Sequence, residues 1–267
     1  MSSPARKSRG LGSGIWLWAG LLLIAGLVLL LDNFLLLGDF NAVSLLPLLL
    51  VVIGAQILLR GDVVPSTEAR TFGITRGSVE SGTLEISSGA VDVEVRALQR
   101  DGRLIAGQYA AQSRPYLNVQ NNYAHLKMER SATPWFTFAD WQVGLARDLP
   151  WQLLVSTSLG QVNVDCSGLI LQDVVLATGF GHIRFVSPSE ALGPVYLRST
   201  LGNIYVVTPP GYRTQVTVQG SRLFSTRVDA RRYEAAGAGV YVARDAADDA
   251  PLVEIVVSGT FGDAYLA

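Results

Sequence analysis

Three consecutive copies of one short pattern determine the fold class of this chain. They are Val155-Ser-Thr-Ser-Leu-Gly160-Gln-Val-Asn-Val164, Leu176-Ala-Thr-Gly-Phe-Gly181-His-Ile-Arg-Phe185 and Leu197-Arg-Ser-Thr-Leu-Gly202-Asn-Ile-Tyr-Val206, with successive glycines 21 residues apart. In each copy an apolar side chain stands five residues before the glycine, and others stand two and four residues after it. This period of two is typical of strands with one buried face. The glycine provides a sharp corner that a side chain would obstruct.

The constant spacing of the copies predicts a repeat architecture. Looser copies lie at Leu84–Val93 and Val257–Leu266, centred on Gly89 and Gly262. Val216 and Val218 keep the 21-residue spacing, and Leu223 then takes the glycine position. Rungs that bury their apolar residues on one another form a β-solenoid. We therefore predict a mainly-β, single-stranded β-solenoid with rungs of about 21 residues over 78–267. An antiparallel β-sandwich is the alternative, but it has no reason to keep a constant rung length.

The N-terminal part of the chain is strongly apolar. Between Ile15 and Leu59 the only ionisable residues are Asp32 and Asp39, which separate two apolar runs of 18 residues each. As a helix, 18 residues reach about 27 Å, enough for a thin hydrocarbon core. We therefore predict a two-helix transmembrane hairpin over 14–60, after a basic N-terminal segment, 1–13. A cleaved signal peptide fits less well because a second apolar run follows the first.

Charge around the two apolar runs predicts their orientation. The turn between the two runs has no basic residue. The basic residues precede the first run or follow the second: Arg6, Lys7, Arg9, Arg60, Arg70 and Arg76. Because basic residues stay on the cytoplasmic side, both termini are expected there, in a multi-pass protein of the plasma membrane. Residues 61–77, with Pro, Ser, Thr and Gly, are expected to form a linker to the solenoid.

The composition leaves little material for catalysis. The chain carries 21 basic and 22 acidic residues, a net charge of -1 that gives no field to attract nucleic acid. A single cysteine, Cys166, excludes a disulfide framework, and His125 and His182 are the only histidines. The outward strand positions Asp92, Asn163, Arg184 and Tyr205 present no stacked pair of acids. We predict no catalytic, cofactor-binding or metal-binding residues, and no cofactor.

Two clusters leave alternatives open. The aromatic cluster Trp135, Phe136, Phe138, Trp141 and Trp151 lies in a less regular interval, Arg96 to Trp151, that is expected to pair onto the first rung. It is either a hydrophobic plug that closes one end of the solenoid or a ligand-binding surface. The second cluster is Asp245, Asp248 and Asp249, which is either a cation site or an exposed loop.

Parts of the sequence resemble known bacterial families. Residues Gly20–Asn33 and Leu46–Gly54 resemble the LiaI/LiaF-like transmembrane region. Trp141–Leu145, Pro150–Leu153 and Val164–Leu169, together with the glycine repeats, resemble the toast-rack domain, also known as an adhesin-like or LiaF C-terminal-like β-solenoid. This resemblance implies an envelope-stress membrane protein, since LiaF-like proteins restrain a membrane histidine kinase. The chain departs from LiaF in having one hairpin and in Ala264, where a larger apolar residue is usual, and no functional residue is carried over.

These observations favour a binding protein over an enzyme. We expect a non-enzymatic, LiaF-like regulatory component of the cell-envelope stress response that acts through protein–protein contacts. Its expected partners are the lipid bilayer, a membrane histidine kinase or another envelope-stress protein, and a second copy of itself. The alternative is a membrane-tethered structural scaffold or an adhesin-like solenoid that self-assembles. A polysaccharide-processing β-solenoid enzyme is a third hypothesis.

Overall fold

A computed structural model describes residues 69–99, 102–110, 115–130, 140–247 and 249–267. The chain divides into two compact units, Met1–Gly61 and Asp62–Ala267, and all described residues lie in the second. The hairpin predicted over 14–60 falls outside them and stays a prediction. The described residues include no helix with the length and apolarity that crossing a membrane requires.

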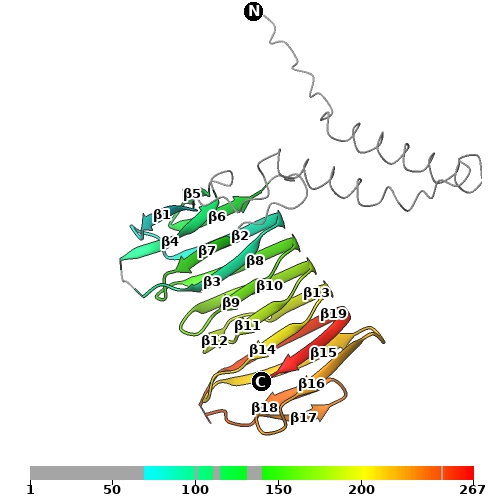
Figure 1. Ribbon diagram of the computed structural model, residues 1–267. Helices are drawn as coiled ribbons and strands as arrows, with labels where there is room; N and C mark the ends of the chain where they lie inside the picture. Colours follow the sequence, from blue (N-terminus) through cyan, green and yellow to red (C-terminus); the bar gives the residue numbers. More distant parts are fainter. Residues whose placement is uncertain (1–68, 100–101, 111–114, 131–139, 248) are drawn as a thin grey trace, which may run out of the picture. The chain divides into compact units, whose positions relative to one another are not determined.

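The three repeats that determine the fold class form three stacked parallel rungs (Figure 1). Their strands are β8 (Pro150–Leu159), β9 (Val162–Asp165), β10 (Ile170–Phe180), β11 (Ile183–Val186), β13 (Val195–Leu201) and β14 (Ile204–Val207). Leu176 pairs with Val155 on one side and Leu197 on the other, so the register follows the 21-residue spacing of the sequence. The mainly-β prediction is confirmed.

Each rung contributes to two sheets, here called sheet A and sheet B. Sheet B contains the strand before each corner, in the spatial order β5 (Tyr116–Gln120), β6 (Tyr123–Glu129), β2 (Ser81–Ala90), β8, β10, β13, β19 (Leu252–Leu266), β15 (Arg213–Gly220), β18 (Val240–Ala243), β17 (Tyr233–Gly237). Sheet A contains the strand after it, in the order β1 (Ala69–Thr75), β4 (Arg103–Ala110), β7 (Asp140–Leu145), β3 (Asp92–Ala97), β9, β11, β14, β19, β16 (Phe224–Val228). The two-residue β12 (Glu190–Ala191) pairs with the start of β10. One hydrophobic core contains the buried apolar residues of both sheets.

Glycine is required at the corners because the rungs approach closely there. Gly160, Gly181 and Gly202 have φ of 150°, 151° and 147°. A Cβ on Gly181 would lie 1.9 Å from the carbonyl oxygen of Gly160, and a Cβ on Gly202 would lie equally close to that of Gly181. Gly262, at φ 124°, continues this glycine stack against Gly202. The sequence-based assignment of these corners is confirmed.

The first rung is shifted by two residues from its predicted alignment. It consists of β2 (Ser81–Ala90) and β3 (Asp92–Ala97). Ala90 pairs with Leu159 and Val93 with Val162, so Val91, not Gly89, lies at the corner. Glu94 rather than Asp92 therefore shares an outward row with Asn163. The prediction was wrong here because a shift of two residues keeps every apolar side chain on the same face.

Around this rung, the N-terminal end is built from strands that are out of sequence order. They are β1 (Ala69–Thr75), β4 (Arg103–Ala110), β5 (Tyr116–Gln120), β6 (Tyr123–Glu129) and β7 (Asp140–Leu145). β6 and β7 add a parallel rung outside β2 and β3, and β1, β4 and β5 pair antiparallel beyond it. The interval expected to pair onto the first rung does so, and β1 lies within the range predicted as linker.

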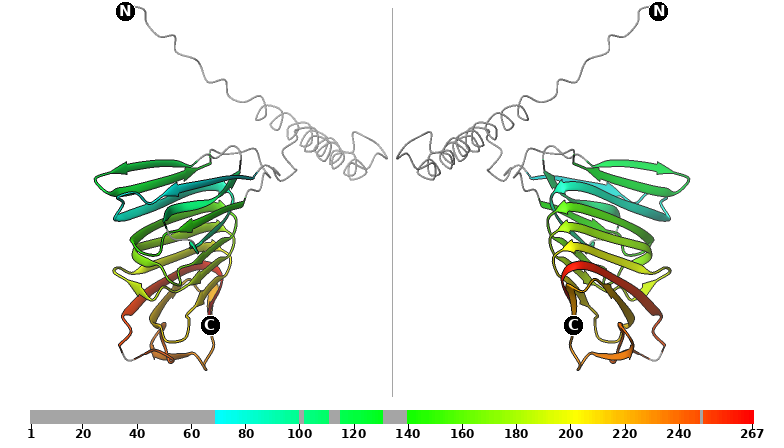
Figure 2. Two further views of the ribbon diagram at one scale, coloured as in Figure 1. Left: turned by 90° about the vertical axis from the view of Figure 1, so that its left-hand side faces the viewer. Right: turned by 90° about the vertical axis from the view of Figure 1, so that its right-hand side faces the viewer.

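At the C-terminal end the chain returns into the stack. Its strands are β15 (Arg213–Gly220), β16 (Phe224–Val228), β17 (Tyr233–Gly237), β18 (Val240–Ala243) and β19 (Leu252–Leu266). Val216 and Val218 are level with Val195 and Leu197, as the 21-residue spacing predicts. However, β19 lies between β15 and β13. Figure 2 shows β19, in red, between the yellow and orange strands. At the last corner Phe224, not Leu223, is level with Gly262, because residues 221–223 form a turn that adds one residue.

Candidate interaction surface

Cys166 is a structural residue of the core. Its side chain is fully buried, and burial raises the pKa of its thiol, with a smaller contribution from the neighbouring carboxylate of Asp165. A thiol that stays protonated and is closed to solvent is a poor nucleophile and a poor metal ligand. The structure therefore gives Cys166 a packing role.

The two histidines lie apart in the stack, His125 in strand β6 of sheet B and His182 at a corner between β10 and β11. His125 belongs to an exposed charged cluster on sheet B, where its Nε2 lies 2.9 Å from Glu85 Oε2 and Lys127 lies 2.7 Å from Glu129. His182 lies at a corner, where its Nδ1 accepts a hydrogen bond of 3.0 Å from the backbone N–H of Asn203. Neither position brings a histidine together with Cys166.

The hydrogen bond of His182 belongs to a polar ladder along the corner of the solenoid. Asn203 Oδ1 accepts a hydrogen bond from the backbone N–H of Asp263 at 3.0 Å, and Asp92 Oδ1 accepts one from that of Gln161 at 2.6 Å. In these three pairs the side chain after one corner accepts a hydrogen bond from the backbone of the equivalent residue on the adjacent rung. This repeated bond indicates a structural role for the ladder.

The ladder continues into a row of aromatic and basic side chains on sheet A. The rings of Tyr205 and Tyr265 stack with centroids 4.8 Å apart, and the guanidinium of Arg227 lies 5.6 Å from the Tyr265 centroid. Asp263 accepts a hydrogen bond from Ser225, which is the main reason that its pKa is lowered; Arg227 and Tyr265 lower it further. Because the stacked rings face one another along the row, they offer ring edges rather than open faces to solvent.

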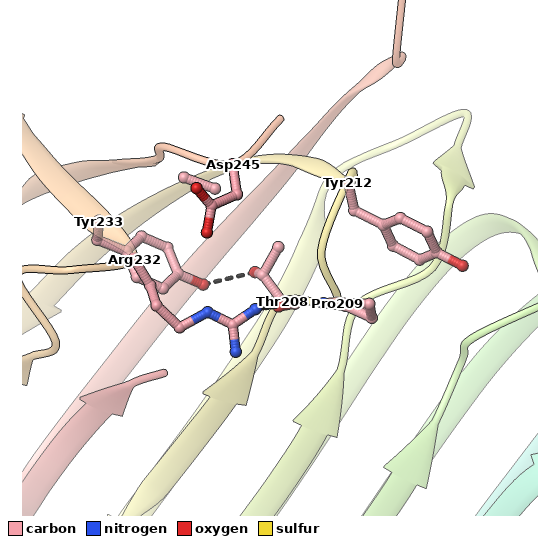
Figure 3. Close-up of a pocket in the computed structure, with 7 residues that line it drawn as sticks. Thr208, Pro209, Tyr212, Arg232, Tyr233 and Asp245 are labelled. Carbon is pink, nitrogen blue, oxygen red and sulfur yellow. Dashed lines mark hydrogen bonds between the residues drawn. The ribbon is translucent and has the colours of Figure 1, made fainter. Parts of the chain in front are cut away.

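A small pocket lies at the C-terminal end, beside the predicted acidic loop. Figure 3 shows Tyr233 and Arg232 directed toward Thr208, whereas the ring of Tyr212 points away. The pocket is lined by Thr208, Pro209, Tyr212, Arg232, Tyr233, Ala243 and Asp245. Tyr233 and Thr214 hydrogen-bond to the Thr208 hydroxyl, and burial raises the pKa of Tyr233. With about 10 Å³ of free space the pocket holds no more than roughly one water.

The predicted acidic and aromatic clusters are only partly described. Asp245 and Asp249 are exposed, Asp248 lies outside the described residues, and the described part of the chain holds no group of three or more potential metal ligands. Trp135, Phe136 and Phe138 also lie outside it. Trp141 and Trp151 are fully buried, and the Trp151 indole N–H donates to the Ala146 carbonyl at 2.8 Å. The burial of these two rings favours the plug interpretation.

The most distinctive surface feature is a row of large apolar side chains along the corner of the solenoid. We call it the corner column: Leu159, Phe180, Leu201 and Phe261, which are 42 to 56% exposed. Each directly precedes a corner glycine, and the strand register places the four on successive rungs. Isolated exposed apolar residues are normal, but a contiguous patch indicates an interaction site.

A second apolar row crosses the outer face of sheet B. We call it the strand column: Leu154, Val175, Tyr196 and Val256, of which Val175 and Tyr196 are 40% and 48% exposed. Between the two columns lies a band of mostly small side chains: Ser156, Ser158, Ala177, Gly179, Arg198, Thr200, Ser258 and Thr260. Arg198 is the only charged member of the band. We call the strand column, this band and the corner column at the end of the strands the sheet B face.

Sequence reasoning missed the sheet B face although its signal was present. The residue before each corner glycine is Leu, Phe, Leu and Phe in turn, at a strand end where a polar residue is expected. The strand column also has a signal in the sequence. Each of its members is an apolar residue between two apolar core residues of the same strand. The outward positions that sequence reasoning did consider lie on sheet A.

Comparison with known proteins agrees with this architecture. The family described as the N-terminal domain of toast_rack, DUF2154, matches residues 64–185. The structure is similar to that of a candidate cell adhesion protein from Clostridium sporogenes ATCC 15579, with a TM-score of 0.62, 13% identity, and coverage of 74% of this chain and 98% of that one. The strand-built part of the chain is a toast-rack-like β-solenoid.

Two further comparisons give no additional information about the fold. A candidate adhesin from Bacteroides fragilis NCTC 9343 matches 76% of this chain and 99% of its own at 12% identity, but with a TM-score of 0.31, too low to bear on the fold. No curated protein matches the chain. The similarity to the Clostridium structure, at 13% identity, concerns the fold alone.

Proposed function

We propose that this chain is a non-enzymatic, membrane-anchored interaction protein of the LiaF type, which acts in the cell-envelope stress response through protein–protein contacts. The observation that carries the proposal is the sheet B face. It is a largely uncharged surface with an exposed corner column and a partly exposed strand column, on a domain whose polar ladder at the corner is held by internal hydrogen bonds.

The membrane part of the proposal rests on the sequence of residues 14–60, and the kinase part on the resemblance to LiaF. We propose that the hairpin anchors the chain in the plasma membrane with both termini in the cytoplasm. A solenoid on that side can reach the cytoplasmic part of a sensor histidine kinase. The proposed partners are therefore the bilayer and such a kinase.

Cysteine labelling in intact bacterial cells tests the location. The full chain with Ser189→Cys presents an exposed thiol after β11, whereas Cys166 is buried and gives little background. With a membrane-impermeant maleimide, we expect labelling only after permeabilisation, and the chain in the membrane fraction. Labelling of intact cells would contradict the kinase-regulator role and support the adhesin-like alternative.

A signalling assay tests the role itself. Deleting the chain should raise the phosphorylation of the response regulator paired with its kinase, and wild type should restore the restraint. We expect Phe180→Glu to restore at most about a tenth of it, because a charge cannot be buried in an apolar contact. Asn163→Glu is the matched control, since it adds the same charge to the exposed face of sheet A. Equal restoration by both variants would exclude the sheet B face from the role.

A further inference from the structure

We infer that the end of the solenoid formed by β1, β4 and β5 binds the bilayer surface, through the anionic headgroups of the cytoplasmic leaflet. The inference deepens the proposed function and rests on its membrane anchor. It gives the chain a second contact with lipid, outside the predicted hairpin, and leaves the sheet B face free for a protein partner.

The length of the tether identifies this end. Only residues 61–68 separate the predicted hairpin from Ala69, the first residue of β1. A fully extended chain gains at most about 3.6 Å per residue, so Ala69 stays within roughly 30 Å of the bilayer surface. Sheet B extends over roughly 43 Å at about 4.8 Å per strand, with β5 at the end that carries β1 and β17 at the other (Figure 1). The end with β1 is therefore the end that the tether holds near lipid.

Two strands have free edges at this end. Among the described strands, β1 pairs only with β4, and β5 pairs only with β6. Tyr116 and Val119 on β5 are 68% and 47% exposed. Because they are three residues apart, they lie on opposite faces of β5 and flank its free edge. A tyrosine suits the boundary between lipid and water, since its ring is apolar and its hydroxyl is polar.

The charges at this end complement an anionic surface. Strands β1, β4 and β5 contain no Asp or Glu, and their only charged residues are Arg70 and Arg103. Although Arg103 lies on β4, its guanidinium reaches across β1, because a Cβ on Gly73 would lie 2.9 Å from its Nη1. Both arginines are exposed, and neither forms an ion pair with another described residue. The anionic cytoplasmic leaflet attracts such side chains.

These features are confined to the end of the stack. One strand further in, acidic residues return with Glu129 on β6 and Asp140 on β7. The opposite end lacks the same combination: β16, β17 and β18 contain Arg227 together with Glu234, and none of the exposed large apolar side chains lies on them. The distribution favours contact with lipid through the end rather than through a face of the solenoid.

We call the four exposed residues Arg70, Arg103, Tyr116 and Val119 the end surface. Near an anionic leaflet each arginine favours the bound state about fivefold, or about 25-fold for both. This attraction is weak for a free domain, but the short tether keeps the end surface at a high effective concentration beside the headgroups. Binding should therefore depend on the charge of the lipid and on salt.

Fluorescence of the full chain in vesicles tests the inference. Asn118→Cys places an exposed thiol on β5, whereas Cys166 is buried. With the environment-sensitive fluorophore NBD on this thiol, we expect about twofold higher emission in phosphatidylcholine vesicles with about 30% phosphatidylglycerol than in phosphatidylcholine alone. Raising NaCl from about 0.1 M to 1 M shortens the Debye length from about 10 Å to about 3 Å and should abolish the rise. The same label on Ala235→Cys, on β17, should give equal emission in both vesicles.

Charge variants then decide whether the arginines make the contact. Added to Asn118→Cys, the pair Arg70→Gln and Arg103→Gln should abolish the rise. The pair Arg222→Gln and Arg231→Gln is the matched control, since it removes two exposed positive charges beside β16 and should preserve the rise. Folding of each variant is checked with the native thiol, because Cys166 stays unreactive only while the core is closed.

Three results overturn the inference. Equal emission from Asn118→Cys in the two kinds of vesicle, with the chain floating with the vesicles, shows that this end does not bind anionic headgroups. A rise from a label on Thr200→Cys in place of Asn118→Cys shows that the sheet B face lies on the bilayer instead. A chain that does not float with the vesicles contradicts the membrane anchor, and so contradicts the proposed function as well.

Discussion

The central rungs and the two ends of the solenoid are built by different rules. From β8 to β14 the chain moves one rung forward every 21 residues, and each strand pairs with the strand one repeat away. At the N-terminal end, β2 and β3 lie between β8/β9 and the later β6/β7. At the C-terminal end, β19 lies between β13/β14 and β15/β16.

This difference shows how the stack is completed at each end. A simple repeat leaves an outermost rung with one apolar flank and unpaired backbone, which invites further pairing. At each end here, an inserted rung is covered by an outer rung and then by antiparallel strands: β1, β4 and β5 at one end, β17 and β18 at the other. The centre therefore depends on local repetition and the ends on long-range insertion.

The largest expected effect comes from removing the inserted strand. Truncation after Ala250 deletes β19, whose four large buried residues Val253, Ile255, Val257 and Leu266 each contribute about 1.5–3 kcal/mol. That loss is comparable with the entire stability of a typical domain, about 5–15 kcal/mol. We expect no cooperative unfolding transition in a urea titration followed by circular dichroism.

The matched control removes one central repeat. Deletion of residues 167–187 takes out 21 residues and joins Cys166 to Pro188, so that the next repeat occupies the vacated rung in the same register. We expect this shorter chain to unfold cooperatively. Equal damage from the two deletions would contradict the distinction between centre and ends.

The corner glycines give the next largest effect. Gly181→Ala forces a Cβ against the Gly160 carbonyl at a φ of 151°, so we expect a loss of about 3–5 kcal/mol from backbone strain and overpacking together. Gly89→Ala should change stability by less than about 0.5 kcal/mol, because no atom lies within 4 Å of its Cβ position. Comparable losses measured by urea titration would restore Gly89 as a corner.

Alkaline pH should weaken the centre before the C-terminal end. Burial raises the pKa of Cys166 in the centre and of Tyr233 at the end. For an acid with a raised folded-state pKa, stability is complete below the unfolded-state pKa and falls as pH rises above it. The loss is about 1.4 kcal/mol per pH unit for each group, beginning near pH 8.5 for Cys and near pH 10 for Tyr.

Two substitutions separate these contributions in denaturant titrations between pH 7 and 11. Cys166→Ala should flatten the decline that begins near pH 8.5, and Tyr233→Phe should flatten only the part near pH 10. The comparison uses the slope against pH, so a constant cost of either substitution cancels. An unchanged slope in both variants would assign the alkaline loss to other groups.

The smallest effect concerns acid stability at the last corner. Hydrogen bonding from Ser225, with help from Arg227 and Tyr265, lowers the pKa of Asp263. A lowered pKa contributes stability above the unfolded-state value, near pH 4, and loses it as pH falls. Asp263→Asn should therefore slightly flatten the loss of stability below pH 4 in thermal melts; an unchanged loss would contradict this role of Asp263.

The sequence predicted the parts of the fold that depend on neighbouring residues. Apolar alternation and the glycines fixed the register of the three central rungs, because each contact there is repeated 21 residues later. The placement of β19 could not be predicted in the same way. Its copy of the repeat fits beside β13, but nothing local in the sequence shows that β15, which comes earlier in the chain, will lie on its far side.

The candidate surface was predictable in part. The residue before each corner glycine can be identified from the repeat. The same apolar residue would also fit a buried strand end, and only the geometry of the corner exposes it to solvent. Phe224 illustrates the opposite case, since a similar aromatic residue folds inward over Gly220 and Gly259. Phe224 is level with the corner glycine Gly262, because the turn at 221–223 adds one residue, whereas Phe180 lies one position before its corner glycine.

The position of β19 also governs when this domain can be completed during synthesis. β19 is synthesised after every strand that it joins. The edges of β13 and β15 therefore stay unpaired while about 30 further residues are translated. At typical rates of synthesis this lasts on the order of seconds, long enough for another strand to bind the open edges. The domain therefore has a vulnerable interval before its last strand is synthesised, in which chaperones can protect the open edges.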